Sequence, residues 1–166
     1  MKISKLILIV LVCLLPATLL AQTAAPFTIL ITEAYYNTTS DDTVSEWIEI
    51  ANVGGEPIDL SQISLGDAQT SGASEGMMRF PQESIIEAGQ VIVVAQTAVS
   101  FQQNFGFKPD YEITDTDDAV PNMSSYDLWS SGTLAMANDG DEILLLHQLT
   151  ILDSLNYGNS EFFFSP

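Results

Sequence analysis

Basic residues are nearly missing from this 166-residue chain, and cysteine and histidine occur once each. Four Lys and Arg stand against 22 Asp and Glu, which gives a net charge of −18 at pH 7. Affinity for a phosphate backbone depends on Lys and Arg displacing counterions, so this composition excludes a general electrostatic binder of DNA or RNA. The same shortage of cations excludes adsorption to anionic lipid headgroups.

The N-terminal segment carries two of the four basic residues, Lys2 and Lys5, and an uncharged apolar run follows at positions 6–15. A basic start, a short apolar stretch and then small residues are typical of a secretory signal peptide. We predict a signal peptide over residues 1–21, with cleavage after Ala21 or as late as Ala24. An uncleaved N-terminal anchor is the alternative, because the stretch extended to position 20 approaches the length of a transmembrane helix.

Removal of residues 1–21 changes the balance of charges. The product, residues 22–166, keeps all 22 acidic residues and has Arg79 and Lys108 as its bases, hence a net charge of −20. It also loses Cys13, so it can form neither a disulfide nor a thiol nucleophile. We therefore predict a secreted or cell-surface protein with no stable membrane insertion after cleavage. Its length suits a single domain, and its periodic apolar residues argue against disorder.

Short segments rich in β-branched and aromatic residues, separated by turn signals, make up the exported part. The segments expected to be strands are Phe27–Tyr36, Glu46–Asn52, Ile58–Leu65, Gln90–Gln96, Leu134–Asn138, Glu142–Gln148 and Ile151–Tyr157. Asp139-Gly140 predicts a hairpin between the fifth and sixth of these, and Ala98–Phe105 is the helical candidate. The polar stretches 66–76 and 114–125 are typical of surface loops. This pattern predicts an all-β, antiparallel β-sandwich.

The order of several motifs resembles the lamin tail domain family, in its bacterial secreted form. The motifs are I-L-I-T-E-A-Y-Y-N, E-W-I-E-I-A-N-V-G-G-E-P-I-D-L-S, Q-V-I-V-V-A, F-Q-Q-N-F-G, L-A-M-A-N-D-G-D-E-I-L-L-L and I-L-D-S-L-N-Y-G. The resemblance runs from about Ile29 to Gly158 and implies an immunoglobulin-like β-sandwich over residues 22–166. The family pattern continues into one more strand, so we expect this domain to lack its last strand and the chain to be a fragment. Three consecutive Phe residues near the end would then form an exposed apolar patch.

One string matches a catalytic motif. Gly72-Ala73-Ser74-Glu75-Gly76 has the form G-x-S-x-G, which places a nucleophilic serine on a sharp turn between a strand and a helix. Neither a buried strand before it nor a helix after it is expected here, and the single His147 is the only available base. A flexible loop is the better interpretation, and we predict no catalytic residues. A lone histidine without cysteine also makes no zinc site.

Oxygen ligands are dense in one loop. Asp115, Asp117 and Asp118 are candidate calcium ligands, because extracellular calcium sites are built from loop carboxylates. They lack the glycine and the bidentate glutamate of an EF-hand, and a solvated acidic loop is the alternative. We predict no cofactor other than this candidate calcium ion.

Two other sets of residues bear on function. Glu33, Glu46 and Glu49 lie where the family pattern has acids, but Glu46 and Glu49 are three apart on a strand and point to opposite faces, which argues against a catalytic pair. A second set of aromatic residues could stack on carbohydrate or pack in the core. These are Tyr35, Tyr36, Trp47, Tyr126 and Trp129.

Taken with the resemblance, these observations predict a protein that is not an enzyme. We expect a secreted or cell-surface β-sandwich module for protein interaction, attachment or scaffolding, whose partner is an unknown protein or a surface glycan and not a nucleic acid. The alternative is an accessory N-terminal domain of a secreted hydrolase, of nuclease or phosphoesterase type, with its catalytic part beyond residue 166. A third hypothesis is calcium-dependent adhesion.

Overall fold

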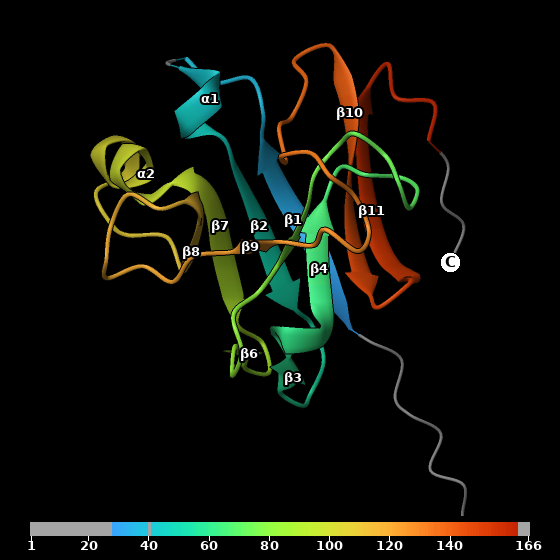
Figure 1. The fold of residues 1–166 in the computed structure, drawn as a ribbon. Coiled ribbons are helices and arrows are strands. Elements are labelled where there is room, and N and C mark those ends of the chain that lie inside the picture. The colour runs from blue at the N-terminus through green and yellow to red at the C-terminus, as the bar shows by residue number, and fades with distance from the viewer. Residues whose placement is uncertain (1–27, 40, 163–166) are drawn as a thin grey trace, which may run out of the picture.

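Two β-sheets packed face to face form the body of the protein (Figure 1). The computed structural model describes residues 28–39 and 41–162. The predicted signal peptide, 1–21, lies outside the described residues. In the described part of the chain no helix is long and apolar enough to cross a membrane.

The four-stranded sheet has the order β1-β2-β7-β8, and the five-stranded sheet has the order β11-β10-β4-β5-β9. The strands of the first are β1 (Ile29–Tyr35), β2 (Trp47–Asn52), β7 (Val91–Thr97) and β8 (Tyr111–Thr114). Those of the second are β4 (Ile63–Gly66), β5 (Met77–Arg79), β9 (Ser124–Ser125), β10 (Gly140–His147) and β11 (Thr150–Gly158). A separate small pair joins β3 (Ile58–Asp59) to β6 (Ile85–Ile86).

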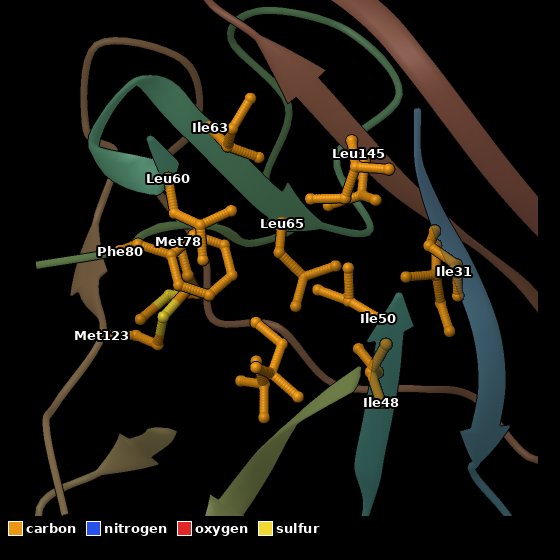
Figure 2. Close-up of a cluster of buried hydrophobic side chains, with 14 of the residues drawn as sticks. Ile31, Ile48, Ile50, Leu60, Ile63, Leu65, Met78, Phe80, Met123 and Leu145 are labelled. Atoms are coloured by element: carbon orange, nitrogen blue, oxygen red, sulfur yellow. The ribbon is translucent and has the colours of Figure 1, made fainter. Parts of the chain in front are cut away.

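Aliphatic side chains from both sheets meet in one core (Figure 2). Successive residues of a strand point to opposite faces, so Ile48 and Ile50 enter the core while Trp47 and Glu49 face outward. Leu65 and Leu145 fill the core from the facing sheet and are fully buried. This burial drives the packing of the sheets and confirms the predicted all-β sandwich.

The helix predicted at Ala98–Phe105 is α2, with the same bounds. The Thr97 side chain accepts a hydrogen bond from the Ser100 N–H, and Gly106 ends the helix in the left-handed region at φ 82°. Helix α2 connects β7 to β8, which pair in parallel, because a helical crossover returns the chain to the starting end of the sheet. The expectation of a purely antiparallel arrangement is wrong at this pair. A short helix, α1 (Asp42–Ser45), was not expected; it lies at the same end as α2 (Figure 1).

The strand expected at Ile58–Leu65 is divided. Strand β3 ends at Asp59, whose side chain accepts a hydrogen bond from the Ser61 N–H and caps a 3-10 turn over Leu60–Gln62. The turn carries the chain from the small β3–β6 pair into β4 of the five-stranded sheet. A polar residue that caps a turn therefore interrupts an apparently continuous strand.

The predicted hairpin around Asp139-Gly140 is wrong. Strand β10 pairs with β11 instead, through a turn at Gln148 and Leu149 in which Gln148 has a φ of 56°. Residues 134–138 form no strand, because side-chain carboxylates accept their N–H groups. The bonds run from Ala135 to Asp67, from Met136 to Glu46 and from Ala137 to Asp141. We call residues 134–138 the carboxylate-bound segment.

The outer face of the five-stranded sheet is covered by a second apolar cluster. Its buried members are Ala68, Met77, Tyr126, Leu144 and Leu146. Loops supply the cover, and the Trp129 indole N–H donates to the Ala68 carbonyl at 2.9 Å. Phe162 packs against this cluster and is half-buried, so the first of the three C-terminal Phe residues is not part of an exposed patch. Phe163 and Phe164 lie outside the described residues.

Candidate functional site

The outer face of the four-stranded sheet carries a group of aromatic rings. Tyr35 of β1 lies directly opposite Trp47 of β2, and both point away from the core. Helix α2 packs beside β7 and brings Phe101 and Phe105 against the same indole, and Phe107 follows the helix. We call Tyr35, Trp47, Phe101, Phe105 and Phe107 the aromatic surface.

The rings contact one another in a continuous chain. Ring centroids are 5.8 Å apart between Tyr35 and Trp47, 5.7 Å between Trp47 and Phe105, and 4.7 Å between Phe101 and Phe105. Most of the contacts are edge-on, a favourable geometry for aromatic pairs. Phe101 is buried, whereas Phe105 and Phe107 are 41% and 57% exposed. The inner rings therefore hold the outer two in place at the surface.

Two carboxylates, those of Glu33 and Glu49, lie on the same face of the sheet as Tyr35 and Trp47, two residues along each strand. A β-bulge in β1 at Thr32 places Glu33 directly opposite Glu49 of β2, and bulges commonly re-aim side chains in this way. Like charges in a directly opposed cross-strand pair are destabilising. The Thr32 hydroxyl donates to Glu49 Oε1 at 2.7 Å, which orients that carboxylate. We call Glu33 and Glu49 the cross-strand acid pair.

The combined surface is chemically suited to a cation. A Lys or Arg side chain is attracted to the faces of Trp, Tyr and Phe rings, and it would relieve the repulsion within the cross-strand acid pair. Phe101 and Phe105 at helical spacing and the outward face of Trp47 were visible in the sequence. The sequence did not show that these rings lie beside Glu33 and Glu49, because that placement depends on where α2 packs and on the bulge in β1.

The aromatic residues considered in the sequence do not share one surface. Tyr35 and Trp47 lie together, but the Tyr36 ring stacks on Tyr157 with centroids 3.9 Å apart and packs against the core. Tyr126 and Trp129 cover the five-stranded sheet. A single stacking platform for carbohydrate built from these five residues is therefore not what the fold provides.

The G-x-S-x-G string and the histidine lie at opposite ends of β4. Ser74 is in the loop before β5, and no helix follows it. The Gly76 carbonyl accepts from the Asp67 N–H just past the end of β4, whereas His147 pairs with Ile63 at its start. The strand–turn–helix context that the serine chemistry requires is not formed.

The candidate calcium loop is organised around a carboxylate that the sequence did not reveal. Glu112 is fully buried and accepts hydrogen bonds from the N–H groups of Ala98, Thr116 and Asp117 and from the Thr116 hydroxyl. Burial raises the pKa of Glu112, but these four hydrogen bonds lower it by a larger amount. The pKa of Glu112 therefore lies below its usual range. The carboxyl is therefore charged in the neutral-pH protein.

The three candidate ligands lie around that buried anion. Asp117 Oδ2 pairs with the Lys108 ammonium at 2.6 Å, and Asp117 Oδ1 accepts from the Ala119 N–H. Asp115 and Asp118 are exposed. Within residues 28–39 and 41–162, no group of three or more His, Cys, Asp or Glu residues could hold a metal ion. Calcium binding by Asp115, Asp117 and Asp118 stays a prediction, and it would compete with Lys108 for Asp117.

The carboxylate-bound segment brings a different kind of buried acid together. Glu46 and Asp67 are 4% and 3% exposed. Burial raises the pKa of Glu46 to about 7. The hydrogen bond from the Met136 N–H lowers this pKa in part, and the nearby charge of Asp42 raises it. Burial likewise raises the pKa of Asp67 to about 7, against bonds from the Ala135 and Gly76 N–H groups. The sequence marked Glu46 but not Asp67, because the partners of Asp67 are distant in the chain.

Glu142 is the least satisfied acid of this region. It is 3% exposed; its Oε2 accepts from the Ser160 hydroxyl at 2.9 Å, and its Oε1 is buried with no hydrogen-bond partner among the described residues. Glu46 and Glu49 do lie on opposite faces, as the spacing predicted, with Glu46 buried and Glu49 on the outer face.

The two packed sheets define a β-sandwich module. The chain belongs to the lamin tail domain family, because the family model described as Lamin Tail Domain matches residues 22–159. No curated protein matches the chain.

Among solved structures, the chain is similar to a DUF4876 family protein from Bacteroides thetaiotaomicron, with a TM-score of 0.57 and 13% sequence identity. The match covers 81% of this chain and 55% of that one, so this chain spans about half the length of that relative. At this identity the likeness shows a shared fold.

Proposed function

We propose that this protein is a non-catalytic, exported β-sandwich module that attaches to a partner protein through the aromatic surface and the cross-strand acid pair. One observation carries the proposal: exposed rings of Phe105 and Phe107 continue a fixed aromatic cluster that borders two directly opposed carboxylates, Glu33 and Glu49. Membership of the lamin tail domain family supports a non-catalytic role. Export to the exterior or the cell surface rests on the N-terminal sequence alone.

The partner should present basic side chains among apolar ones. Aromatic residues at a surface supply contact area with little loss of conformational entropy, and they dominate binding energy at protein interfaces. The net charge of −20 on residues 22–166 attracts a basic partner from a distance and speeds its association at low salt. The same charge repels phosphate backbones, so we expect no retention of duplex DNA in a mobility-shift assay at physiological salt. Micromolar retention would contradict this.

The first test measures binding of an oligolysine peptide by calorimetry, with an oligoglutamate peptide as the negative probe. We expect the wild-type protein to bind oligolysine and the double substitution Phe105→Ala and Phe107→Ala to weaken it about tenfold or more, as loss of aromatic anchors does. Leu149→Ala is the matched control, because Leu149 is 72% exposed in the β10–β11 turn. Equal losses in both variants would refute the assignment of the surface.

The acid pair is tested with a matched change of charge. Glu33→Gln with Glu49→Gln removes the same charge as Glu56→Gln with Glu87→Gln, two exposed acids elsewhere. We expect only the first pair of substitutions to abolish the preference for oligolysine. If both variants lose affinity equally, the interaction is a response to net charge and not to this surface.

A second candidate function is an accessory domain beside a catalytic part of a longer secreted hydrolase. The observation that favours it is that the solved relative is about twice as long as the matched region. Reading the gene downstream of codon 166 tests it. A nuclease or phosphoesterase signature there would replace stand-alone attachment as the function of the whole protein.

A further inference from the structure

Arg79 and Lys108, the two basic residues of the described chain, differ in what they contact. The Lys108 ammonium is paired with Asp117 at 2.6 Å. The Arg79 guanidinium makes no hydrogen bond or ion pair with any residue that the structure describes, and its Nε is buried. Arg79 as a whole is half-buried, so the two terminal nitrogens of the guanidinium, and not the buried Nε, are the donors left for a ligand.

The surrounding strands fix the position of this guanidinium. Arg79 ends β5 and pairs with Ser124 of β9, the edge strand of the five-stranded sheet. The centre of the guanidinium lies 3.8 Å from the centroid of the Tyr126 ring, a stacking contact that favours arginine. Phe80, the next residue, is buried and packs edge-on against Tyr111 with centroids 5.1 Å apart. The donors of Arg79 are thus held before any ligand arrives.

A cleft of about 430 Å³ opens at this position. Its volume is in the range of small-molecule sites. The residues with polar side chains that line it with Arg79 are Gln82, Ser124, Ser125, Tyr126 and Asp127. Pro81 and Leu128 add apolar surface, and Leu128 is 87% exposed.

The lining selects a particular kind of ligand. A guanidinium fork matches a carboxylate through two parallel hydrogen bonds. Hydroxyl, amide and carboxylate side chains around it can donate to and accept from the hydroxyl groups of a sugar, and exposed apolar surface can cover its C–H face. Asp127 in the same lining disfavours a second anionic group beside the one that Arg79 binds, so each sugar ring in the cleft should carry no more than one carboxylate. A sugar ring with a single carboxylate meets all of these conditions.

We propose that this cleft binds a uronic-acid residue of an acidic glycan, with the sugar carboxylate on Arg79 and the ring hydroxyls on Ser124, Ser125 and Gln82. The site lies on the opposite sheet from the aromatic surface and does not depend on it. The module therefore has a protein-binding face on one sheet and a glycan-binding cleft at the edge of the other.

The test is calorimetric titration of the intact protein with trigalacturonate, with neutral galactotriose and with acetate. We expect trigalacturonate to bind in the millimolar range and each of the other probes to bind at least about tenfold more weakly. Galactotriose lacks the bidentate carboxylate contact, and acetate lacks the hydrogen bonds of the ring hydroxyls. No binding of trigalacturonate would overturn the proposal. Equal binding of galactotriose would remove the role of the carboxylate, and equal binding of acetate would reduce the site to a general anion site, so either result also overturns it.

Charge-matched variants locate the site. Arg79→Gln and Lys108→Gln remove the same charge, and we expect only Arg79→Gln to lose trigalacturonate binding. Equal losses would contradict a site at Arg79. Arg79→Lys keeps the charge without the fork and should bind weakly; it also reports on the cleft if Arg79→Gln fails to fold. Oligolysine binding by the same variants should be unchanged, so failure here is distinguishable from failure of the protein-binding surface.

Discussion

Two regions of the sandwich bury carboxylates in opposite ways. At the start of α2, Glu112 accepts four hydrogen bonds and has a lowered pKa. Beside the carboxylate-bound segment, Glu46 accepts a hydrogen bond from the Met136 N–H at 3.2 Å. Burial, together with the nearby charges of Asp42 and Asp141, raises the pKa of Glu46 to about 7. Burial disfavours the charge of both. At Glu112 the four hydrogen bonds outweigh the effect of burial, whereas at Glu46 burial outweighs the bond from Met136.

The largest effect is expected where the donors are most numerous. Glu112→Gln places an amide NH2 against two hydrogen-bond donors whichever way it is oriented, because both carboxylate oxygens accept two bonds. We expect the free energy of unfolding at pH 7 to fall by about 2–4 kcal/mol, measured by urea denaturation. Glu56→Gln, on an exposed loop, is the control and should change it little. A loss as small as the control's would mean that the donors do not hold Glu112 as an anion.

The same substitution should loosen the aromatic surface. The Ala98 N–H that Glu112 accepts is the first of helix α2, and α2 carries Phe101 and Phe105. A negative charge at this helix end also interacts favourably with the helix dipole.

The stability that Glu112 provides is complete above its ordinary pKa of 4.5 and is lost as the pH falls through its lowered folded-state pKa. The Glu112→Gln variant lacks this titrating carboxyl, so its free energy of unfolding should fall less than that of the wild-type protein as the pH is lowered.

Glu46 should show the opposite dependence on pH. Because its folded-state pKa is about 7 and its ordinary value is 4.5, the folded protein holds this proton more tightly than the unfolded chain. Its contribution to stability is present below pH 4.5 and is lost as the pH rises to about 7. Glu46→Gln keeps an acceptor for the Met136 N–H and has no charge to bury. We expect the change in the free energy of unfolding that Glu46→Gln causes to be more favourable at pH 8 than at pH 4.5, by about 1–3 kcal/mol.

Urea denaturation of Glu46→Gln and of the wild-type protein at the two pH values measures this difference. Glu56→Gln is the control, because Glu56 lies on an exposed loop outside both buried regions. The comparison between the two buried regions fails if Glu46→Gln destabilises the protein equally at both pH values.

The sequence was sufficient where local pattern and tertiary structure agree. The alternation of Ile48 and Ile50 with Trp47 and Glu49 predicts β2 and its core face, and the bounds of α2 follow from its flanking Thr97 and Gly106. The sequence failed at residues 134–138, whose apolar alternation resembles a strand. There the N–H groups of Ala135 and Met136 bond to the carboxylates of Asp67 and Glu46, which are distant in the chain, and a local pattern carries no record of such partners.

The candidate sites divide in the same way. Phe101 and Phe105 at i, i+4 spacing were visible, but the packing of α2 against Trp47 was not. Asp115, Asp117 and Asp118 were conspicuous as a run of acids, whereas Glu112, the residue that organises their loop, stands in an ordinary strand pattern. Density of acidic residues in sequence thus does not identify the acid that the fold uses.

The smallest effect is expected from calcium. The loop that carries Asp115, Asp117 and Asp118 already has its internal donors bound to Glu112, and Lys108 neutralises Asp117. A calcium ion would gain the attraction of three carboxylates but would have to displace that ammonium, and loop sites of this kind bind in the millimolar range at best. We expect the thermal midpoint to be the same with and without millimolar calcium. A rise that Asp115→Asn and Asp118→Asn abolish, and that magnesium does not reproduce, would establish a calcium site. It would also show that a carboxylate-rich loop can recruit a cation even when its central acid is already satisfied by N–H donors.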